Sequence, residues 1–173
     1  GTKTRIIDAG LAYYHLHGHR QSRHFVNVAG MAFDAEVTRD ANNSKSALGP
    51  VQYWMSLAKV IFTYNAVPIR VEVDGIAYED KTFCLNVGNC MYAGGGMMIV
   101  PNAKPDDGLF TITHIKNVSR WTVIANVAAL GDGTFTKLDN VEQYMGKNVK
   151  VTSPVPVWLE VEGEVLGEAP FEF

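Results

Sequence analysis

Carboxylates gather near the end of the sequence, where Glu160, Glu162, Glu164 and Glu168 surround Gly163. A carboxylate can act as a general base when it lies within about 3 Å of the atom whose proton it removes. The segment 162–164 is typical of a hairpin turn flanked by acids. Carboxylates in such turns are usually solvated. A catalytic role would require that they face a cleft, which the sequence alone does not reveal.

A second acidic pair, Asp106 and Asp107, lies in the turn KPDDGL at 104–109. Turn carbonyls and one carboxylate are hard oxygen ligands that suit Mg²⁺ or Ca²⁺. An Asp-Asp-Gly turn is also commonly no more than a turn, so both interpretations stay open. Three glycines at 94–96 precede it and cost backbone entropy on folding. They indicate either a close approach of backbone or ligand, or a bulge at a sheet edge.

Two weaker motifs favour structural roles. His15, His17 and His19 alternate and could bind zinc or copper, but no neighbouring carboxylate or cysteine completes a site, which favours an exposed hairpin tip. The segment GDGT at 131–134 follows a helical pattern, whereas a phosphate loop leads from a strand into a helix. We therefore interpret Gly131 as the left-handed residue that ends a helix.

The composition describes an ordinary globular chain of one domain, 1–173, with 47% hydrophobic and 19% charged residues. A net charge of −3 argues against a nucleic-acid partner. No apolar run is long enough for a transmembrane segment. Cys84 and Cys90 are interpreted as reduced packing residues, which predicts a cytoplasmic protein. Gly1 resembles a protease scar, so the chain is expected to begin within a longer protein.

Alternation and helical spacing predict the elements that must position these residues. Helices are expected at 33–43, at 51–64, and at 119–130 with Ser119 as its cap. Strands are expected at 4–16, 23–31, 68–89 (a hairpin turning at Asp74-Gly75), 108–116, 147–153, 155–163 and 171–173. Strands dominate without βαβ alternation. The predicted fold class is therefore mainly β (α+β), an antiparallel β-sandwich with about three inserted helices.

Three ordered segments resemble the diacylglycerol kinase catalytic superfamily, which includes bacterial lipid kinases and sphingosine kinases. FVNVAGMAFDAEV at 25–37 is similar to its F-x-N-x-A-G-x-G-F-D-A segment. NVGNCMYAGGGMMIVPNAKPDDGLFTI at 86–112 is similar to its V-x-N-x-x-x-x-G-G-G-x-x-x-x-P-x-A-x-x-D-D-G-L segment. PVPVWLEVEGEVLGEAPFEF at 154–173 is similar to its closing P-x-x-x-x-x-D-G-E-x-x-G-x-x-P stretch.

The resemblance implies the C-terminal β-sandwich domain of a two-domain kinase that transfers the γ-phosphoryl group of ATP to a lipid hydroxyl. The N-terminal domain would carry a Gly-Gly-Asp-Gly-Thr nucleotide loop, which this sequence lacks, so the chain alone is expected to be inactive. The expected partners are that N-terminal kinase domain and a lipid substrate at the membrane surface. The lipid itself is left open: diacylglycerol, phosphatidylglycerol and sphingoid bases all suit the family.

The resemblance also implies site residues. Mg²⁺ would be held by the carboxylate of Asp107 and the carbonyls of Lys104 and Leu109, with water completing an octahedron at about 2.1 Å. Glu162 matches the family's general base, and Glu164 matches the acid that supports the metal and water network. Because Glu is one methylene longer than Asp, either Glu162 remains the base, or Glu164 or a water takes over, or activity is low. Because the family has Asp at the position of Glu162, a second hypothesis is a non-catalytic lipid- or partner-binding domain of a diverged kinase.

One further departure concerns Ala32, which stands where the family has glycine. The glycines at 94–96 would let the backbone approach the interdomain cleft.

Overall fold

The computed structural model describes residues 4–44 and 50–173, so Gly1 lies outside the described residues. The strands are β1 (Gly10–Leu16), β2 (His19–Phe25), β3 (Val28–Ala32), β4 (Val67–Val73), β5 (Ile76–Gly88), β6 (Phe110–Lys116), β7 (Val141–Gly146), β8 (Val149–Thr152), β9 (Trp158–Val161) and β10 (Glu164–Glu172). The helices are α1 (Phe33–Asn43), α2 (Pro50–Thr63) and α3 (Arg120–Asn126), with 3₁₀ turns η1 (Gly94–Gly96), η2 (Val127–Leu130) and η3 (Thr134–Lys137).

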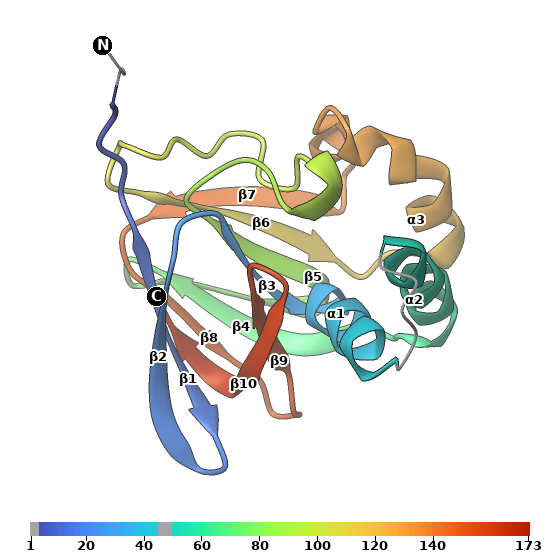
Figure 1. Ribbon diagram of the computed structural model, residues 1–173, viewed down its shortest axis with the longest axis horizontal. Coiled ribbons are helices and arrows are strands. Elements are labelled where there is room, and N and C mark those ends of the chain that lie inside the picture. The colour runs from blue at the N-terminus through green and yellow to red at the C-terminus, as the bar shows by residue number, and fades with distance from the viewer. Residues whose placement is uncertain (1–3, 45–49) are drawn as a thin grey trace.

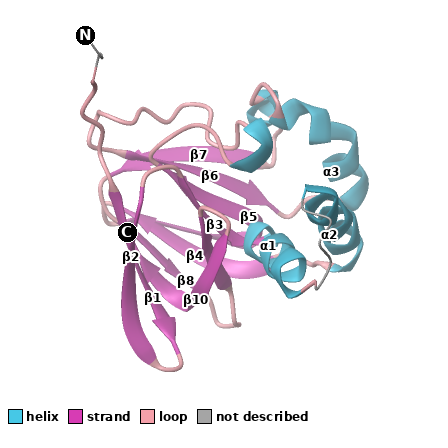
Figure 2. Cartoon of the chain, viewed as in Figure 1, coloured by secondary structure: helices cyan, strands magenta, loops and turns pink. Residues whose placement is uncertain are grey.

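The strands form one antiparallel sheet that closes on itself. The pairing runs β10–β8–β4–β5–β3–β9, and β9 pairs again with β10, which completes a ring. The β1–β2 hairpin extends from β10, and β6 with β7 extends from β5 (Figures 1 and 2). Closure pairs the strand edges that an open sheet would leave free.

Mainly β structure with three α-helices is as predicted within the described residues, but the architecture is barrel-like where two separate layers were expected. The reason is the short β9, which pairs with β3 on one side and with β10 on the other. Alternating apolar side chains fill the interior: Ile69, Val71 and Val73 of β4 are all buried in the main core.

The helices gather on one side of the sheet, where α2 lies between α1 and α3 (Figure 1). Phe33 of α1 stacks on Phe83 of β5 with ring centroids 4.4 Å apart, and Val60 and Ile61 of α2 join the same cluster. This second core fixes α1 and α2 against the outside of the barrel. No helix within residues 4–44 and 50–173 is long and apolar enough to cross a bilayer.

Several predicted elements have different bounds. The strand expected at 23–31 breaks between Phe25 and Val28, so its halves belong to β2 and β3. The strand expected at 171–173 is only the end of β10, and β7 was not predicted at all. The side chain of Ser119 does cap α3, accepting from the backbone N–H of Thr122 at 3.1 Å.

The predicted role of Gly131 is wrong. Gly131 has φ −71°, an ordinary right-handed value, and the residue in the left-handed region is Gly133 with φ 74°. The α-helix ends at Asn126 and continues as the 3₁₀ turn η2 to Leu130, the predicted end, but the left-handed residue follows two positions after Gly131. The GDGT segment is nevertheless a turn, in which Asp132 accepts from the backbone N–H of Thr134 at 3.1 Å.

Candidate functional site

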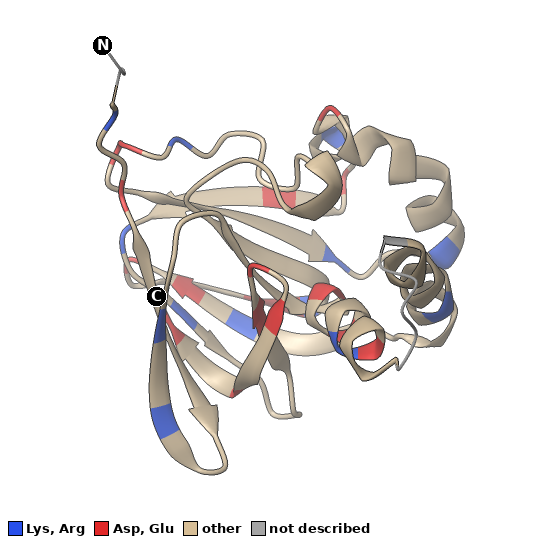
Figure 3. Ribbon diagram, viewed as in Figure 1, with Lys and Arg blue, Asp and Glu red and all other residues tan. Residues whose placement is uncertain are grey.

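An open pocket of about 690 Å³ brings the β9–β10 turn together with the three-glycine loop and the first turns of α1 and α2. Its polar side chains include three carboxyls, Asp34, Glu160 and Glu162. Acidic residues lie on the β9–β10 hairpin and on the adjacent helix α1 (Figure 3). Within the described part of the chain, no Lys, Arg or His lines this pocket. The pocket therefore favours groups that are cationic or that donate hydrogen bonds.

Glu162 occupies the turn between β9 and β10, with φ 51°, followed by Gly163 with φ 87°. Two successive left-handed residues make the tight turn that matches the twist of a hairpin. The Oε1 atom of Glu162 accepts from the backbone N–H groups of Val26 and Asn27, at 2.9 and 3.1 Å. Within the described residues, Oε2 has no hydrogen-bond partner, so it is the oxygen that can take a proton.

Glu164 follows Gly163 but does not line the pocket. It is exposed and pairs with Arg23 of β2 at 2.9 Å. The structure thus brings Glu162 to the pocket and directs Glu164 toward the neighbouring β1–β2 hairpin.

Asp34 was not singled out from the sequence, and Glu160 was named only among the carboxylates that would have to face a cleft. Together they form the pocket's buried acidic pair. Glu160 lies on β9 directly opposite Gly30 of β3, and Asp34 is in the first turn of α1. A side chain at Gly30 would overlap the Asp34 carboxylate and lie 2.8 Å from Oε1 of Glu160. The glycine is therefore needed because two carboxyl groups occupy the space beside its Cα.

Burial raises the pKa of both carboxyl groups. For Glu160, which is 7% exposed, removal from water is the larger cause and the nearby charge of Asp34 adds to it. Backbone N–H groups of Gly163 and Gly30 act in the opposite direction by stabilising the carboxylate, with the Gly163 bond at 2.8 Å. The pKa of Asp34 rises through its loss of water. Two close acids in a poorly solvated site hold a proton more tightly than either would in water.

A hydrogen-bonded chain connects Glu162 to the turn that was predicted to bind metal. The buried amide of Asn89 donates to the carbonyl of Asp8 at 2.8 Å and to the carbonyl of Val26 at 3.1 Å. Val26 in turn donates its N–H to Glu162. The carboxylate of Asp8 accepts from the N–H of Gly108 at 2.8 Å. Asn89 therefore links two segments that lie far apart in sequence.

The predicted metal ligands lie together in this exposed turn. Asp107 accepts from the N–H of Leu109 at 3.0 Å through Oδ1, which leaves Oδ2 without an assigned partner. The residues described contain no cluster of three His, Cys, Asp or Glu side chains suited to a metal. One carboxylate oxygen and the carbonyls of Lys104 and Leu109 suit a hard cation that keeps most of its water.

The glycines at 94–96 lie outside the strands, so the bulge at a sheet edge that was one of the two hypotheses is wrong. Gly95 and Gly96 have φ of 71° and 77°, a backbone that other residues rarely adopt. No atom of the described residues lies within 4 Å of a Cβ placed at these positions. Gly94 and Gly95 line the same pocket as Glu162, and their approach to an interdomain cleft stays a prediction.

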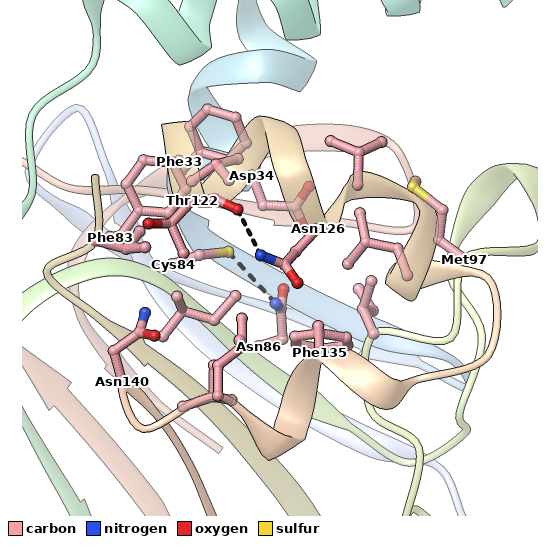
Figure 4. Close-up of a pocket in the computed structure, with 18 of the residues that line it drawn as sticks. Phe33, Asp34, Phe83, Cys84, Asn86, Met97, Thr122, Asn126, Phe135 and Asn140 are labelled. Atoms are coloured by element: carbon pink, nitrogen blue, oxygen red, sulfur yellow. Dashed lines mark hydrogen bonds between the residues drawn. The ribbon is translucent and has the colours of Figure 1, made fainter. Parts of the chain in front are cut away.

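A second cavity, of about 110 Å³, adjoins the pocket and is lined by residues of the helices and of the sheet. Asp34, Tyr53 and Met97 line both spaces, so they stand at the junction. The walls of the inner cavity are mainly apolar, from residues that include Phe33, Leu57, Phe83, Ile115, Val123 and Phe135. Figure 4 shows Asp34, Asn86 and Asn126 among the side chains that line it.

The remaining motifs have structural places. His17 and Gly18 form the exposed turn of the β1–β2 hairpin, with φ of 51° and 79°. Cys84 is buried beside Phe83, Cys90 is partly exposed, and both are free thiols.

The sequence already held signals for the residues that were missed. Asp34 and Asn89 stand within the motif segments, in Phe-Asp-Ala and Val-x-Asn, so their motif positions marked them. For Glu160 the only sequence signal was alternation, which predicts that it lies on the same face of its strand as Glu162. Its burial depends on α1 covering that face, which no local pattern specifies.

A family model described as the YegS C-terminal NAD kinase beta sandwich-like domain matches residues 27–173. A diacylglycerol kinase of Staphylococcus saprophyticus subsp. saprophyticus is 29% identical over 164 residues, covering 90% of this chain and 52% of that protein. A diacylglycerol kinase of Staphylococcus aureus is 28% identical over 159 residues, with coverages of 90% and 50%. The chain thus spans about half the length of the curated relatives it matches.

Solved structures share the fold. A crystal structure of a provisionally named diacylglycerol kinase from Bacillus anthracis str. Sterne has a TM-score of 0.65 at 22% identity, covering 95% of this chain and 53% of the other. A second diacylglycerol kinase crystal structure from that organism has a TM-score of 0.54 at 19% identity, with coverages of 95% and 50%. At these identities the likeness concerns the fold alone.

Proposed function

We propose that this chain, which belongs to the YegS C-terminal NAD kinase beta sandwich-like domain family, is the lipid-binding half of an ATP-dependent lipid kinase. Its resemblance to the C-terminal domain of the diacylglycerol kinase superfamily is confirmed by the family match and by the kinase relatives. One observation carries the proposal. An acidic pocket that contains Glu162 borders a mainly apolar cavity, and Asp34 and Tyr53 line both.

This arrangement suits a molecule with a polar head and a hydrocarbon tail. The head would lie beside Glu162, and part of the tail would enter the cavity lined by Leu57 and Val123. Each methylene moved from water into apolar surroundings contributes about 0.8 kcal/mol, so a short buried stretch contributes several. A lipid in this position presents its terminal hydroxyl to the acidic pocket.

The reaction requires that the lipid oxygen attack the γ-phosphorus of ATP. A bond forms between that oxygen and phosphorus, the bond from phosphorus to the bridging oxygen of ADP breaks, and the hydroxyl proton goes to Oε2 of Glu162. Its Oε1 atom is already held by Val26 and Asn27, which fixes the direction of the carboxylate. Holding the base in one orientation favours the geometry of attack. Glu164, paired with Arg23, would stabilise the hairpin that carries the base.

Mg²⁺ at the turn of Lys104, Asp107 and Leu109 would supply positive charge that orders this turn when bound. The hydrogen bonds of Asp8 and Asn89 connect this turn to Val26, so an ordered turn would also fix the position of Glu162.

ATP itself would be held mainly by an N-terminal kinase domain, because this sequence has no phosphate-binding glycine loop. We therefore expect the 173-residue chain alone to lack kinase activity. The complete protein would work in the cytoplasm, at the membrane surface where its substrate lies.

A second candidate function is a lipid-binding domain without catalysis. The observation that favours it is that Glu162 accepts hydrogen bonds from two backbone N–H groups, as a glutamate with a purely structural role would also do.

The deciding experiment supplies the full-length protein with labelled ATP, Mg²⁺ and vesicles that contain candidate lipids. Transfer of label to a lipid, abolished by chelating the Mg²⁺, supports the kinase. Lipid binding without transfer to any candidate supports the second function.

A further inference from the structure

Helix α2 carries apolar residues on two opposite faces, and only one of these faces is buried. The buried face packs into the second core through Val60 and Ile61. Exposed apolar residues recur on the other side at the spacing of one helical face: Val51, Trp54, Met55, Ala58 and Phe62. Trp54 is 53% exposed, and more than half of the surface of Met55 and of Phe62 is also accessible to water.

The neighbouring helix α3 adds a second exposed tryptophan. Trp121 lies in the first turn of α3, is 74% exposed, and belongs to a helix that packs beside α2 (Figure 1). We call this set the α2–α3 face: Val51, Trp54, Met55, Ala58, Phe62 and Trp121. Large apolar side chains that gather on a surface mark a place of contact with another molecule.

The charges of the two helices restrict what that molecule is. Residues 50–63 and 120–126 include no Asp or Glu, although the whole chain has 18. Their charged side chains are Lys59, which pairs with Asp40 of α1, and Arg120, which forms no ion pair within the described part of the chain. Figure 3 shows basic but no acidic residues on α2 and α3. Such a face approaches an anionic surface without repulsion, and a cation near a bilayer attracts anionic lipids.

The position of this face beside the candidate lipid site favours a bilayer as its occupant. The inner sides of the same helices line the apolar cavity through Leu57 and Val123. Trp54 lines the outer pocket and is also half exposed. A lipid at the outer side of these helices is therefore separated from the site by a single layer of helices. A protein domain over the same face would stand between the bilayer and the site.

We propose that the α2–α3 face docks the protein on an anionic bilayer, with Trp54 and Trp121 at the level of the headgroups and Arg120 beside lipid phosphates. This inference rests on the lipid kinase function proposed above and identifies the surface through which that enzyme meets its substrate. Tryptophan is the side chain that proteins place at the boundary between headgroups and hydrocarbon. Burial of apolar area and attraction to anionic lipids together provide the binding.

The first test measures contact of the tryptophans with lipid in the full-length protein. The vesicles contain equal amounts of phosphatidylglycerol and a phosphatidylcholine with brominated acyl chains, which quench tryptophan fluorescence on contact. We expect quenching in wild type and its loss when Trp54→Phe and Trp121→Phe are combined. Trp158→Phe is the matched control and should keep the quenching, because this ring lies against the guanidinium of Arg39, 4.8 Å from its carbon. Undiminished quenching in the double variant overturns the inference.

The second test measures binding of the full-length protein to the same vesicles by sedimentation. Trp121→Glu and Met55→Glu should each raise the lipid concentration for half-maximal binding at least about tenfold, because an apolar contact becomes an anion that faces anionic lipids. Ile76→Glu changes a 62% exposed apolar residue at the β4–β5 turn and should leave the binding unchanged. Unchanged vesicle binding by folded Trp121→Glu overturns the inference. If that variant instead separates a dimer, the face joins two copies of the chain, and if it loosens the N-terminal domain, the face joins the two domains.

Kinase assays on the same vesicles distinguish this inference from the proposed function. Equal lipid phosphorylation by wild type and Trp121→Glu overturns the docking surface and leaves the kinase in place. If no lipid is phosphorylated but vesicle binding depends on Trp121 and Met55, the proposed function fails and the docking surface stands.

Discussion

Asp34 and Glu160 approach each other across the bare Cα of Gly30, at the base of the pocket that holds Glu162. Natural proteins seldom keep two acids together in a poorly solvated place unless the site uses them. The pair has a measurable consequence for stability, because burial raises the pKa of both groups above their ordinary range.

The first prediction concerns Glu160→Gln. Above about pH 4.5 the unfolded chain releases the protons of these two acids, whereas the folded state still holds a proton on the pair. The pair therefore lowers the free energy of unfolding as the pH rises from that value. Gln keeps an oxygen that can accept from Gly163 and carries no charge. We expect the variant to be more stable than wild type by at least about 1 kcal/mol at pH 8, with a smaller difference at pH 5. Urea unfolding at several pH values measures this, and a variant less stable at every pH contradicts it.

The second prediction concerns Ala32, which precedes α1 with φ 65° and ψ −118°. Only glycine adopts this backbone without strain, which explains the glycine that the family has there. Ala32→Gly should therefore stabilise the protein by about 1 kcal/mol in thermal unfolding. The matched control is Ala29→Gly in the middle of β3, which should destabilise by a similar amount. Destabilisation by both changes would show that Ala32 is not strained.

The third prediction concerns the connection through Asn89. Asn89→Ala removes the amide that donates to the carbonyls of Asp8 and Val26, and the loss of these two bonds should lower the free energy of unfolding by about 1–3 kcal/mol. In the full-length enzyme it should also weaken the response of kcat to Mg²⁺, because Val26 would no longer be tied to Asp8. Asn102→Ala, an exposed amide that pairs with Gln143, is the control. An unchanged Mg²⁺ response in a folded Asn89→Ala enzyme contradicts the link.

The fourth prediction concerns the inner cavity. Val123→Phe places a ring in the space that the tail would occupy and should raise KM for a long-chain lipid about tenfold, with KM for ATP unchanged. Ile124→Phe is the control, since the neighbouring side chain is 40% exposed and does not line the cavity. Equal KM values for lipid in the two variants would mean that the tail lies elsewhere.

Local patterns predicted much of the fold. Helices α1 and α2 start and end close to the expected residues because apolar spacing and flanking turns determine them. The Asp74-Gly75 turn follows from two residues that tolerate positive φ. Strand β7 was missed because VEQYMG carries only weak alternation, and its pairing with β6 defines it. Ring closure depends on β9 meeting two partners, a contact between distant segments that no local pattern contains.

The parts of the site that lie within short sequence motifs could be predicted from the sequence. The β9–β10 turn and the glycine loop, which both lie in motif segments, line one pocket. The acidic pair could not be predicted, since Glu160 becomes buried only when α1 packs against β9 and brings Asp34 beside it.

The central claim is that Glu162 takes the proton from a lipid hydroxyl, and Glu162→Gln in the full-length protein tests it most directly. The Gln carbonyl oxygen can still accept from Val26 and Asn27, so the turn should keep its geometry while the base is lost. Glu162→Asp, which restores the residue of the family, should preserve or raise the activity and so serves as the control. We predict that ATP-dependent lipid phosphorylation by Glu162→Gln falls at least about a hundredfold, with ATP binding and unfolding temperature unchanged. Full turnover by Glu162→Gln would contradict the claim.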